Sequence, residues 1–121
     1  MIVAGFGFRA GAGPASLRAA FALAQQGRPA VTHLATAQDK RAALVPLARA
    51  LGLPLTGIAP DALAAMPTST RSAASLHARA TGSVAEAAAL AAAGEGAQLL
   101  TSRHISPDRM ATCAIAQGSL T

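Results

Sequence analysis

The stretch that decides the fold is VAGFGFRAGAGPASLRAAFA, residues 3–22. A short apolar run leads into four glycines and one arginine, and an amphipathic helical pattern follows from Pro14. Glycine leaves backbone amides open to a ligand, and the start of a helix adds partial positive charge. The stretch therefore predicts a strand, a loop that binds an anionic group, and a helix.

Short apolar runs alternate with helical patterns along the rest of the chain. Strands are predicted at 1–5, 30–36, 53–59, 97–103 and 110–117. Helices are predicted at 14–27, 38–52, 60–66 and 83–94. This alternation indicates an α/β fold, a three-layer open sheet that is mostly parallel with helices on both faces. Six residues join the last two strands, too few for a crossover helix, so we expect a carboxyl-terminal antiparallel pair.

Length and composition limit the class of protein. The 121 residues fit one domain, 1–121, and residues 67–82 lose all periodicity, which we interpret as a mobile or partly extended connection able to act as a lid. No apolar run reaches the roughly 18 residues of a membrane span. The amino terminus does not resemble a signal peptide, and the single cysteine forms no internal disulfide. We expect a cytoplasmic protein with no membrane partner.

The charge balance favours a polyanionic partner. Ten Lys and Arg face five Asp and Glu, and all the basic residues except Lys40 are arginine, whose planar fork matches carboxylate and phosphate. A GC-rich genome would also produce this arginine excess. The chain has no Trp or Tyr and three Phe, and its basic residues are scattered, which argues against stacking on bases. An RNA-binding module is thus the least favoured alternative, and we expect no nucleic acid partner.

The first loop carries a loose dinucleotide-binding pattern. Gly5, Gly7 and Ala10 satisfy G-x-G-x-x-G/A directly after a strand, but no acidic residue precedes Asp39 to hold a ribose. We therefore expect no nicotinamide or flavin cofactor, and a tight turn alone would explain the glycines. A turn needs no arginine, so Arg9 is the foremost binding residue in the loop.

Two further segments carry polar residues with two possible roles. Thr36, Asp39 and Lys40 follow the second predicted strand, where ligands of open parallel sheets collect. Asp39 would also serve as a helix cap, whereas Lys40 opposes the helix dipole and an anionic ligand would explain it. Ser83 and Glu86 form a capping-box pattern. Asp39 and Glu86 are also the catalytic candidates, as carboxylates that would activate water.

The sequence contains no pattern typical of metal binding or of covalent catalysis. His33, His77 and His104 share no metal-ligand spacing, so no metal site is expected. No serine lies in a nucleophile-elbow pattern, and Cys113 in an alternating strand is expected to be a buried small hydrophobe.

An ordered set of blocks resembles a known family. The blocks are GFGFRAGA at 5–12, LATAQDKR at 34–41, LARALGLPL at 47–55, GSVAEAAALAAAG at 82–94, then LLTSR and ATCAIA. In order and spacing they are similar to the carboxyl-terminal domain of the cobalamin-biosynthesis protein CbiG and its stand-alone counterpart CobE. The family often has a Pro-Ser-Glu element before the last helix, and MPTSTRSAAS at 66–75 has no glutamate.

The resemblance implies a role in cobalamin biosynthesis. Full-length CbiG opens a lactone on a cobalt-precorrin and releases acetaldehyde, whereas the aerobic pathway of CobE removes that carbon with another enzyme. The resemblance therefore implies a protein that binds a precorrin or hydrogenobyrinic-acid-like tetrapyrrole, as a carrier or chaperone, with other pathway enzymes as partners. The alternative is a hydrolase acting on a lactone or ester of a precorrin or cobalt-precorrin.

Such a ligand suits the residues found from the pattern. Corrin intermediates carry acetate and propionate groups around an apolar ring, which basic side chains and small residues would accommodate. The expected ligand-binding residues are Gly5, Gly7, Arg9, Gly11, Ala12, Thr36, Asp39, Lys40, Ser83, Glu86 and Arg103.

Overall fold

The computed structural model describes residues 1–68 and 83–119. The strands are β1 (Ile2–Phe8), β2 (His33–Ala37), β3 (Leu55–Ile58), β4 (Gln98–Ile105) and β5 (Ala111–Gln117). The helices are α1 (Pro14–Gln25), the 3-10 turn η1 (Gln38–Lys40), α2 (Arg41–Leu51), α3 (Pro60–Ala65) and α5 (Val84–Ala93). The connection predicted at 67–82 lies, after Thr68, outside the described residues. Within those residues, no helix has the length and apolar character needed to cross a membrane.

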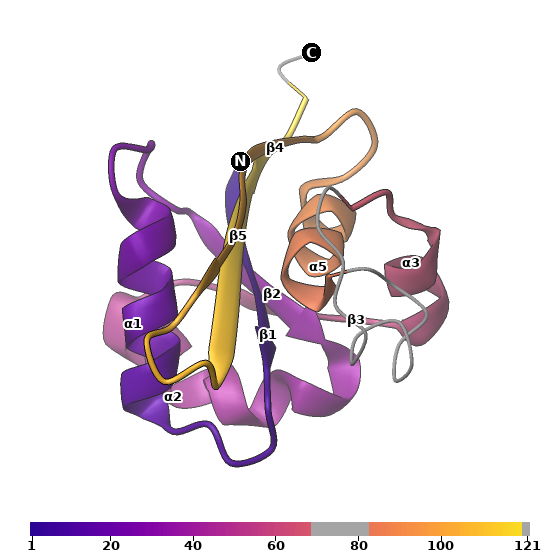
Figure 1. Cartoon of the computed structure of the whole chain (residues 1–121). Coiled ribbons are helices and arrows are strands. Elements are labelled where there is room, and N and C mark those ends of the chain that lie inside the picture. The colour runs from indigo at the N-terminus through magenta and orange to yellow at the C-terminus, as the bar shows by residue number, and fades with distance from the viewer. Residues whose placement is uncertain (69–82, 120–121) are drawn as a thin grey trace.

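The five strands form one sheet in the order β3-β2-β1-β5-β4. β1, β2 and β3 are parallel, and β5 runs antiparallel to both of its neighbours. Helices α1 and α2 cover one face of the sheet, and α3 and α5 cover the other (Figure 1). The expected three-layer α/β fold with a carboxyl-terminal antiparallel pair is confirmed.

The central strand β1 separates two apolar layers. Ala4 and Phe6 point into the core formed with α1 and α2, whereas Val3 points into the core formed with α5. Alternation of this kind follows from the pleat of a strand, in which successive side chains face opposite ways. Because β1 is covered on both sides, almost every residue along it is small or apolar.

Gly5 lets α5 lie directly on β1. A Cβ at Gly5 would be 2.1 Å from the carbonyl oxygen of Ala85 and 2.5 Å from the amide nitrogen of Ala89, so no side chain fits there. The buried face of α5 is correspondingly small, with Ala85, Ala87 and Ala89 fully buried. The glycine is thus required by helix-on-sheet packing.

The first predicted strand is longer than its pattern indicated. Pairing with β5 continues to Phe8, which lies opposite Ala111, so β1 ends three residues later than expected. Gly7 therefore belongs to the strand and not to the loop, which corrects the prediction, and Gly5, the expected last residue of the strand, lies in its middle. The glycine-rich loop itself is restricted to residues 9–13.

The two predicted helix caps have different outcomes. Ser83 caps α5 as expected, since its hydroxyl accepts the Glu86 amide at 3.2 Å. Asp39 is not the N-cap of α2, because η1 precedes the helix and places Lys40 at that position, with no side-chain cap hydrogen bond. The short 3-10 turn thus moves the start of α2 beyond Asp39.

Candidate functional site

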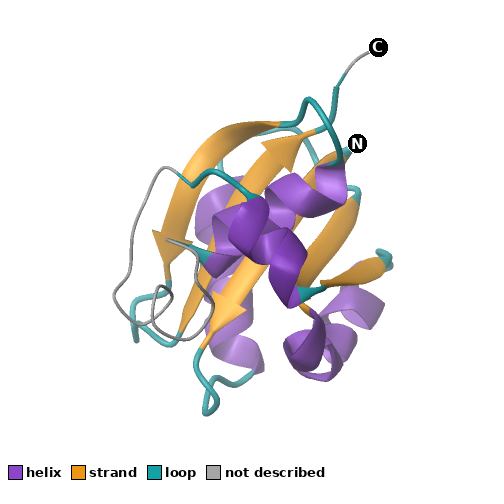
Figure 2. Cartoon of the chain, turned by 90° about the vertical axis from the view of Figure 1, so that its right-hand side faces the viewer, coloured by secondary structure: helices purple, strands orange, loops and turns teal. Residues whose placement is uncertain are grey.

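The segments with predicted site residues meet at one edge of the sheet. β1, β2 and β3 end there, and we call it the carboxyl edge. β4 also ends at this edge, because β5 is antiparallel to both β1 and β4. The start of α5 lies there too, since a Cβ on Gly7 would be 3.2 Å from that of Val84. Figure 2 looks at the face of the sheet that α5 covers.

The loop after β1 has a fixed backbone and an exposed basic side chain. The Arg9 amide donates to the Met110 carbonyl at 2.9 Å, and the Ala12 amide donates to the Arg9 carbonyl at 2.9 Å. Arg9 and Gly11 are exposed, and Ala12 is half-buried. The Arg9 guanidinium is therefore accessible at the carboxyl edge.

Lys40 folds back onto the end of β1. Its Nζ donates to the Phe8 carbonyl at 3.3 Å and lies 5.1 Å from the centre of the Phe8 ring. A cation above an aromatic face is attracted by the ring quadrupole. These contacts explain a lysine just before α2 without any ligand, and they also place a positive charge at the peptide bond that joins Phe8 to Arg9.

Two threonines fix the end of β1 from its neighbouring strands. The hydroxyl of Thr36, on β2, donates to the Phe6 carbonyl at 2.8 Å, and that of Thr112, on β5, donates to the Gly7 carbonyl at 3.1 Å. Thr36 is fully buried. Like Gly5, it has a structural role inside the layers of the fold.

Glu86 connects α5 to β4. Its side chain is fully buried, and Oε2 accepts the backbone amide of Arg103 at 3.0 Å. The β4–β5 register shifts between Thr101 and His104, so Ser102 and Arg103 form a bulge. Bulges re-aim side chains at the ends of sheets. Glu86 and Arg103, both expected in the site, are thus brought together by the backbone of this bulge.

Asp108, in the turn between β4 and β5, was missed by sequence reasoning. Its carboxylate accepts the hydroxyls of Ser106, at 2.6 Å, and of Ser16, and the amide of Met110, at 3.1 Å. These hydrogen bonds, that from Ser106 foremost, hold the pKa of Asp108 below its usual 3.8. The start of α1, expected to bind an anionic ligand, thus faces a carboxylate of its own chain.

The sequence around Asp108 indicates its contacts within the turn but not its contact with Ser16. Ser-Pro-Asp at 106–108 is typical of a turn in which the aspartate binds nearby amides. Its partner Ser16 lies 92 residues away, and no local pattern indicates that contact.

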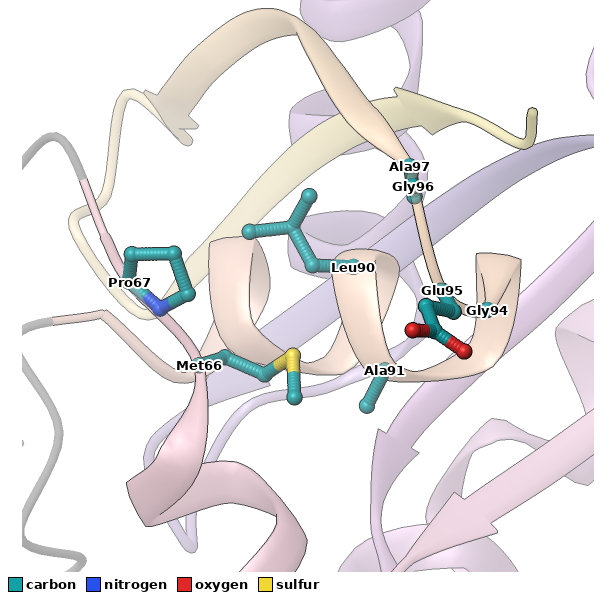
Figure 3. Close-up of a pocket in the computed structure, with 8 residues that line it drawn as sticks. All are labelled: Met66, Pro67, Leu90, Ala91, Gly94, Glu95, Gly96 and Ala97. Carbon is teal, nitrogen blue, oxygen red and sulfur yellow. The ribbon is translucent and has the colours of Figure 1, made fainter.

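A pocket of about 420 Å³ lies at the other end of α5. Figure 3 shows its lining, Met66, Pro67, Leu90, Ala91, Gly94, Glu95, Gly96 and Ala97. Glu95 is the one charged residue in this lining, and it is acidic. The pocket contains none of the predicted site residues and offers no positive charge, so it does not suit a polycarboxylate.

His104 and Cys113 have structural surroundings. Over residues 1–68 and 83–119, no three His, Cys, Asp or Glu side chains are grouped to hold a metal ion. His104 Nε2 lies 2.9 Å from the Thr101 hydroxyl, and His77 is outside the described residues. Cys113 is buried in the core as expected, and burial raises the pKa of its thiol.

Comparison with known proteins assigns the family. The sequence model for the carboxyl terminus of cobalamin synthesis protein G (CbiG) matches residues 2–116. The chain belongs to this family. It is a cobalamin biosynthesis protein of the CobE and CbiG type, as the resemblance in its sequence blocks implied. No sequence among the curated proteins matches it.

Solved structures of the CbiG family share the fold. CobE, from the cobalamin biosynthetic pathway, is 34% identical with a TM-score of 0.84, over 96% of this chain and 89% of CobE. The cobalamin biosynthesis protein chiG from Agrobacterium tumefaciens str. C58 is 35% identical with a TM-score of 0.74, over 98% of this chain and 99% of that one. A cobalamin biosynthesis protein G homolog from Sulfolobus solfataricus, at 16% identity and a TM-score of 0.75, shares the fold over 98% of this chain and 37% of its own.

Proposed function

We propose that this CbiG-family protein binds a polycarboxylate tetrapyrrole intermediate at the carboxyl edge of its sheet. The ligand is of the precorrin or hydrogenobyrinic acid type, in the aerobic cobalamin pathway. In this proposal the protein is a cytoplasmic carrier or chaperone that transfers an unstable intermediate between pathway enzymes. Family membership supports the pathway, and the distribution of charge at the edge supports the chemical class of the ligand.

The observation that carries the proposal is a set of basic residues on separate elements at one edge. Arg9 follows β1, Lys40 follows β2 with its ammonium on the end of β1, and Arg103 lies in the bulge of β4. From β2 to β4 the sheet spans three strand spacings, about 14 Å. Charges spread over that width suit carboxylates arranged around a broad ring, because arginine pairs with carboxylate through two parallel hydrogen bonds.

The small residues at this edge support approach of a flat ring. Gly7 is partly exposed near the start of α5, and Gly11 and Ala12 lie in the loop beside Arg9. Backbone without bulky side chains would let the apolar face of a macrocycle come close. Asp39, exposed in η1, is one of the two acidic residues expected to bind the ligand, and it would face an amide or hydroxyl on the ligand.

The position of Glu86 argues against this residue as the catalytic base of the alternative, hydrolysis of a lactone or ester. A catalytic base must reach a water molecule beside the substrate. Glu86 is fully buried and its Oε2 accepts the Arg103 amide, which is the environment of a structural carboxylate. A substrate-dependent rate that disappears in Glu86→Gln would instead establish the hydrolase.

The proposal is tested by titrating the protein with hydrogenobyrinic acid and, in parallel, with its amidated derivative, by visible absorbance and calorimetry. We expect one-to-one binding that weakens on amidation, because amidation removes carboxylates. Arg9→Ala and Arg103→Ala are each expected to weaken binding about tenfold, the loss of one charge-assisted contact of about 1.4 kcal/mol. Lys40→Met, which keeps an apolar chain over Phe8, should have a similar effect.

The matched control is Arg49→Ala, which removes an exposed arginine from the last turn of α2. It should bind like the parent protein. If Arg9→Ala and Lys40→Met bind as tightly as the parent, the site is wrong. If neither ligand binds, the carrier function is wrong, and assays for hydrolysis of an earlier intermediate follow.

A further inference from the structure

One turn holds both ends of the Arg9 loop. The Arg9 amide donates to the Met110 carbonyl at 2.9 Å, on the far side of the turn between β4 and β5. At the other end of the loop, Ser16 in the first turn of α1 donates to Asp108 in the same turn. Residues 9–13 are therefore anchored to residues 106–110 before and after their exposed part.

Asp108 is the centre of this anchorage. Besides the Ser16 hydroxyl, its carboxylate accepts the Ser106 hydroxyl at 2.6 Å and the Met110 amide at 3.1 Å. Met110 takes part in both contacts: its amide donates to Asp108, and its carbonyl accepts the Arg9 amide. Asp108 thus sets the position of the Met110 peptide groups and of the start of α1 together.

We propose that Asp108 is a positioning residue for the carboxyl-edge site: it holds residues 9–13 in the conformation that presents Arg9 to a polyanionic ligand, without contacting that ligand. The identity of the ligand in this inference rests on the proposed function. The ordering of the loop by Asp108 rests on the hydrogen bonds alone. The inference adds Asp108 to the site, although this residue is negatively charged, as the proposed ligand is.

The physical reason is the cost of ordering a loop that contains Gly11 and Gly13. Glycine loses more conformational entropy on ordering than any other residue. A loop that is already fixed binds more tightly than one that must be ordered by the ligand. Releasing the Asp108 contacts would therefore weaken binding even though no contact to the ligand is lost.

Charge and positioning predict opposite results for Asp108→Ala, and this makes the test sharp. Removing a carboxylate close to Arg9 would strengthen binding of a polyanion if charge alone acted. If Asp108 positions the loop, binding of hydrogenobyrinic acid should instead weaken about tenfold. Glu95→Ala, which removes an exposed carboxylate at the far end of α5, gives the effect of the change in net charge alone.

Two further measurements separate positioning from general damage. Hydrogen exchange of the Arg9 and Ala12 amides, both hydrogen-bonded in the loop, should be about tenfold faster in Asp108→Ala than in the parent. In an Arg9→Ala background the added effect of Asp108→Ala on affinity should fall below about twofold, since residues that act through one another are not additive. Ser16→Ala removes one hydrogen bond and leaves Asp108 exposed to water. It should change the affinity and the amide exchange rate in the same direction as Asp108→Ala, but by a smaller factor. It replaces Asp108→Ala if that variant does not fold.

The inference is overturned if Asp108→Ala binds as tightly as or more tightly than the parent, if its full effect remains in the Arg9→Ala background, or if exchange of the two amides is unchanged. If the parent protein does not bind hydrogenobyrinic acid, the proposed function fails instead. In that case amide exchange alone decides whether Asp108 orders the loop.

Discussion

The buried carboxylate of Glu86, on α5, accepts the backbone amide of Arg103, on β4, at 3.0 Å. The contact joins the first turn of a helix to the bulge of an edge strand. An amide in a bulge has lost its ladder partner, and a carboxylate is a strong acceptor for it. Glu86 thereby supports the peptide that carries one of the three basic residues of the proposed site.

Glu86→Ala should lower the free energy of unfolding by about 1–3 kcal/mol, because it leaves the Arg103 amide without this acceptor and opens a cavity. Glu86→Gln keeps an acceptor oxygen at the same place and should cost less, about 1 kcal/mol. Urea unfolding of both variants measures the difference. Equal losses in the two variants would show that the carboxylate charge, and not its acceptor geometry, matters.

Gly5→Ala should destabilise the protein by about 3 kcal/mol or more, because its Cβ would be 2.1 Å from the Ala85 carbonyl oxygen and α5 would have to move. Gly11→Ala is the control, since its Cβ would make an ordinary contact of 3.4 Å with the Met110 side chain. That variant should stay within about 0.5 kcal/mol of the parent. Denaturant midpoints compare the two, and a tolerated alanine at Gly5 would contradict the close packing of α5 on β1.

Stability in acid should depend on Asp108, whose pKa is lowered by the hydroxyls of Ser106 and Ser16 and the amide of Met110. A carboxyl whose pKa is lower in the folded state adds stability that is complete above the unfolded pKa and is lost as the pH falls through the folded pKa. The Tm advantage of the parent over Asp108→Asn should therefore be constant above about pH 5 and shrink below pH 4.

Ser106→Ala provides the internal check on this pH dependence. It removes the hydrogen bond that lowers the pKa of Asp108 most, so the acid-dependent loss of Tm should be smaller than in the parent and should be complete at a higher pH. An unchanged acid profile in both variants would mean that Asp108 does not contribute to stability in this range.

The thiol of Cys113 should be unreactive in the folded protein. Burial raises its pKa, so very little of the reactive thiolate is present at pH 8. A maleimide or disulfide reagent should label it only as fast as the protein opens, and at full rate in denaturant. Rapid labelling of the native protein would show that the core around β5 opens locally.

Several elements could be predicted from local sequence because their causes are local. The cap at Ser83, the stop at Gly94 and the short connection between β4 and β5 all act within a few residues. The boundaries of β1 and α2 could not be predicted from local sequence. β1 continues to Phe8 because β5, a strand from the other end of the chain, pairs with it that far, and η1 moves the start of α2 to Arg41.

The sequence by itself determined the layers of the fold, the family and the residues that carry positive charge, because periodicity, turn residues and ordered motifs are properties of neighbouring positions. Only the tertiary structure decided what those residues do. It placed Gly5 under α5, Glu86 on the amide of Arg103 and Asp108 on Ser16. Each of these contacts satisfies a packing or hydrogen-bonding need that arises only when distant segments bury one another.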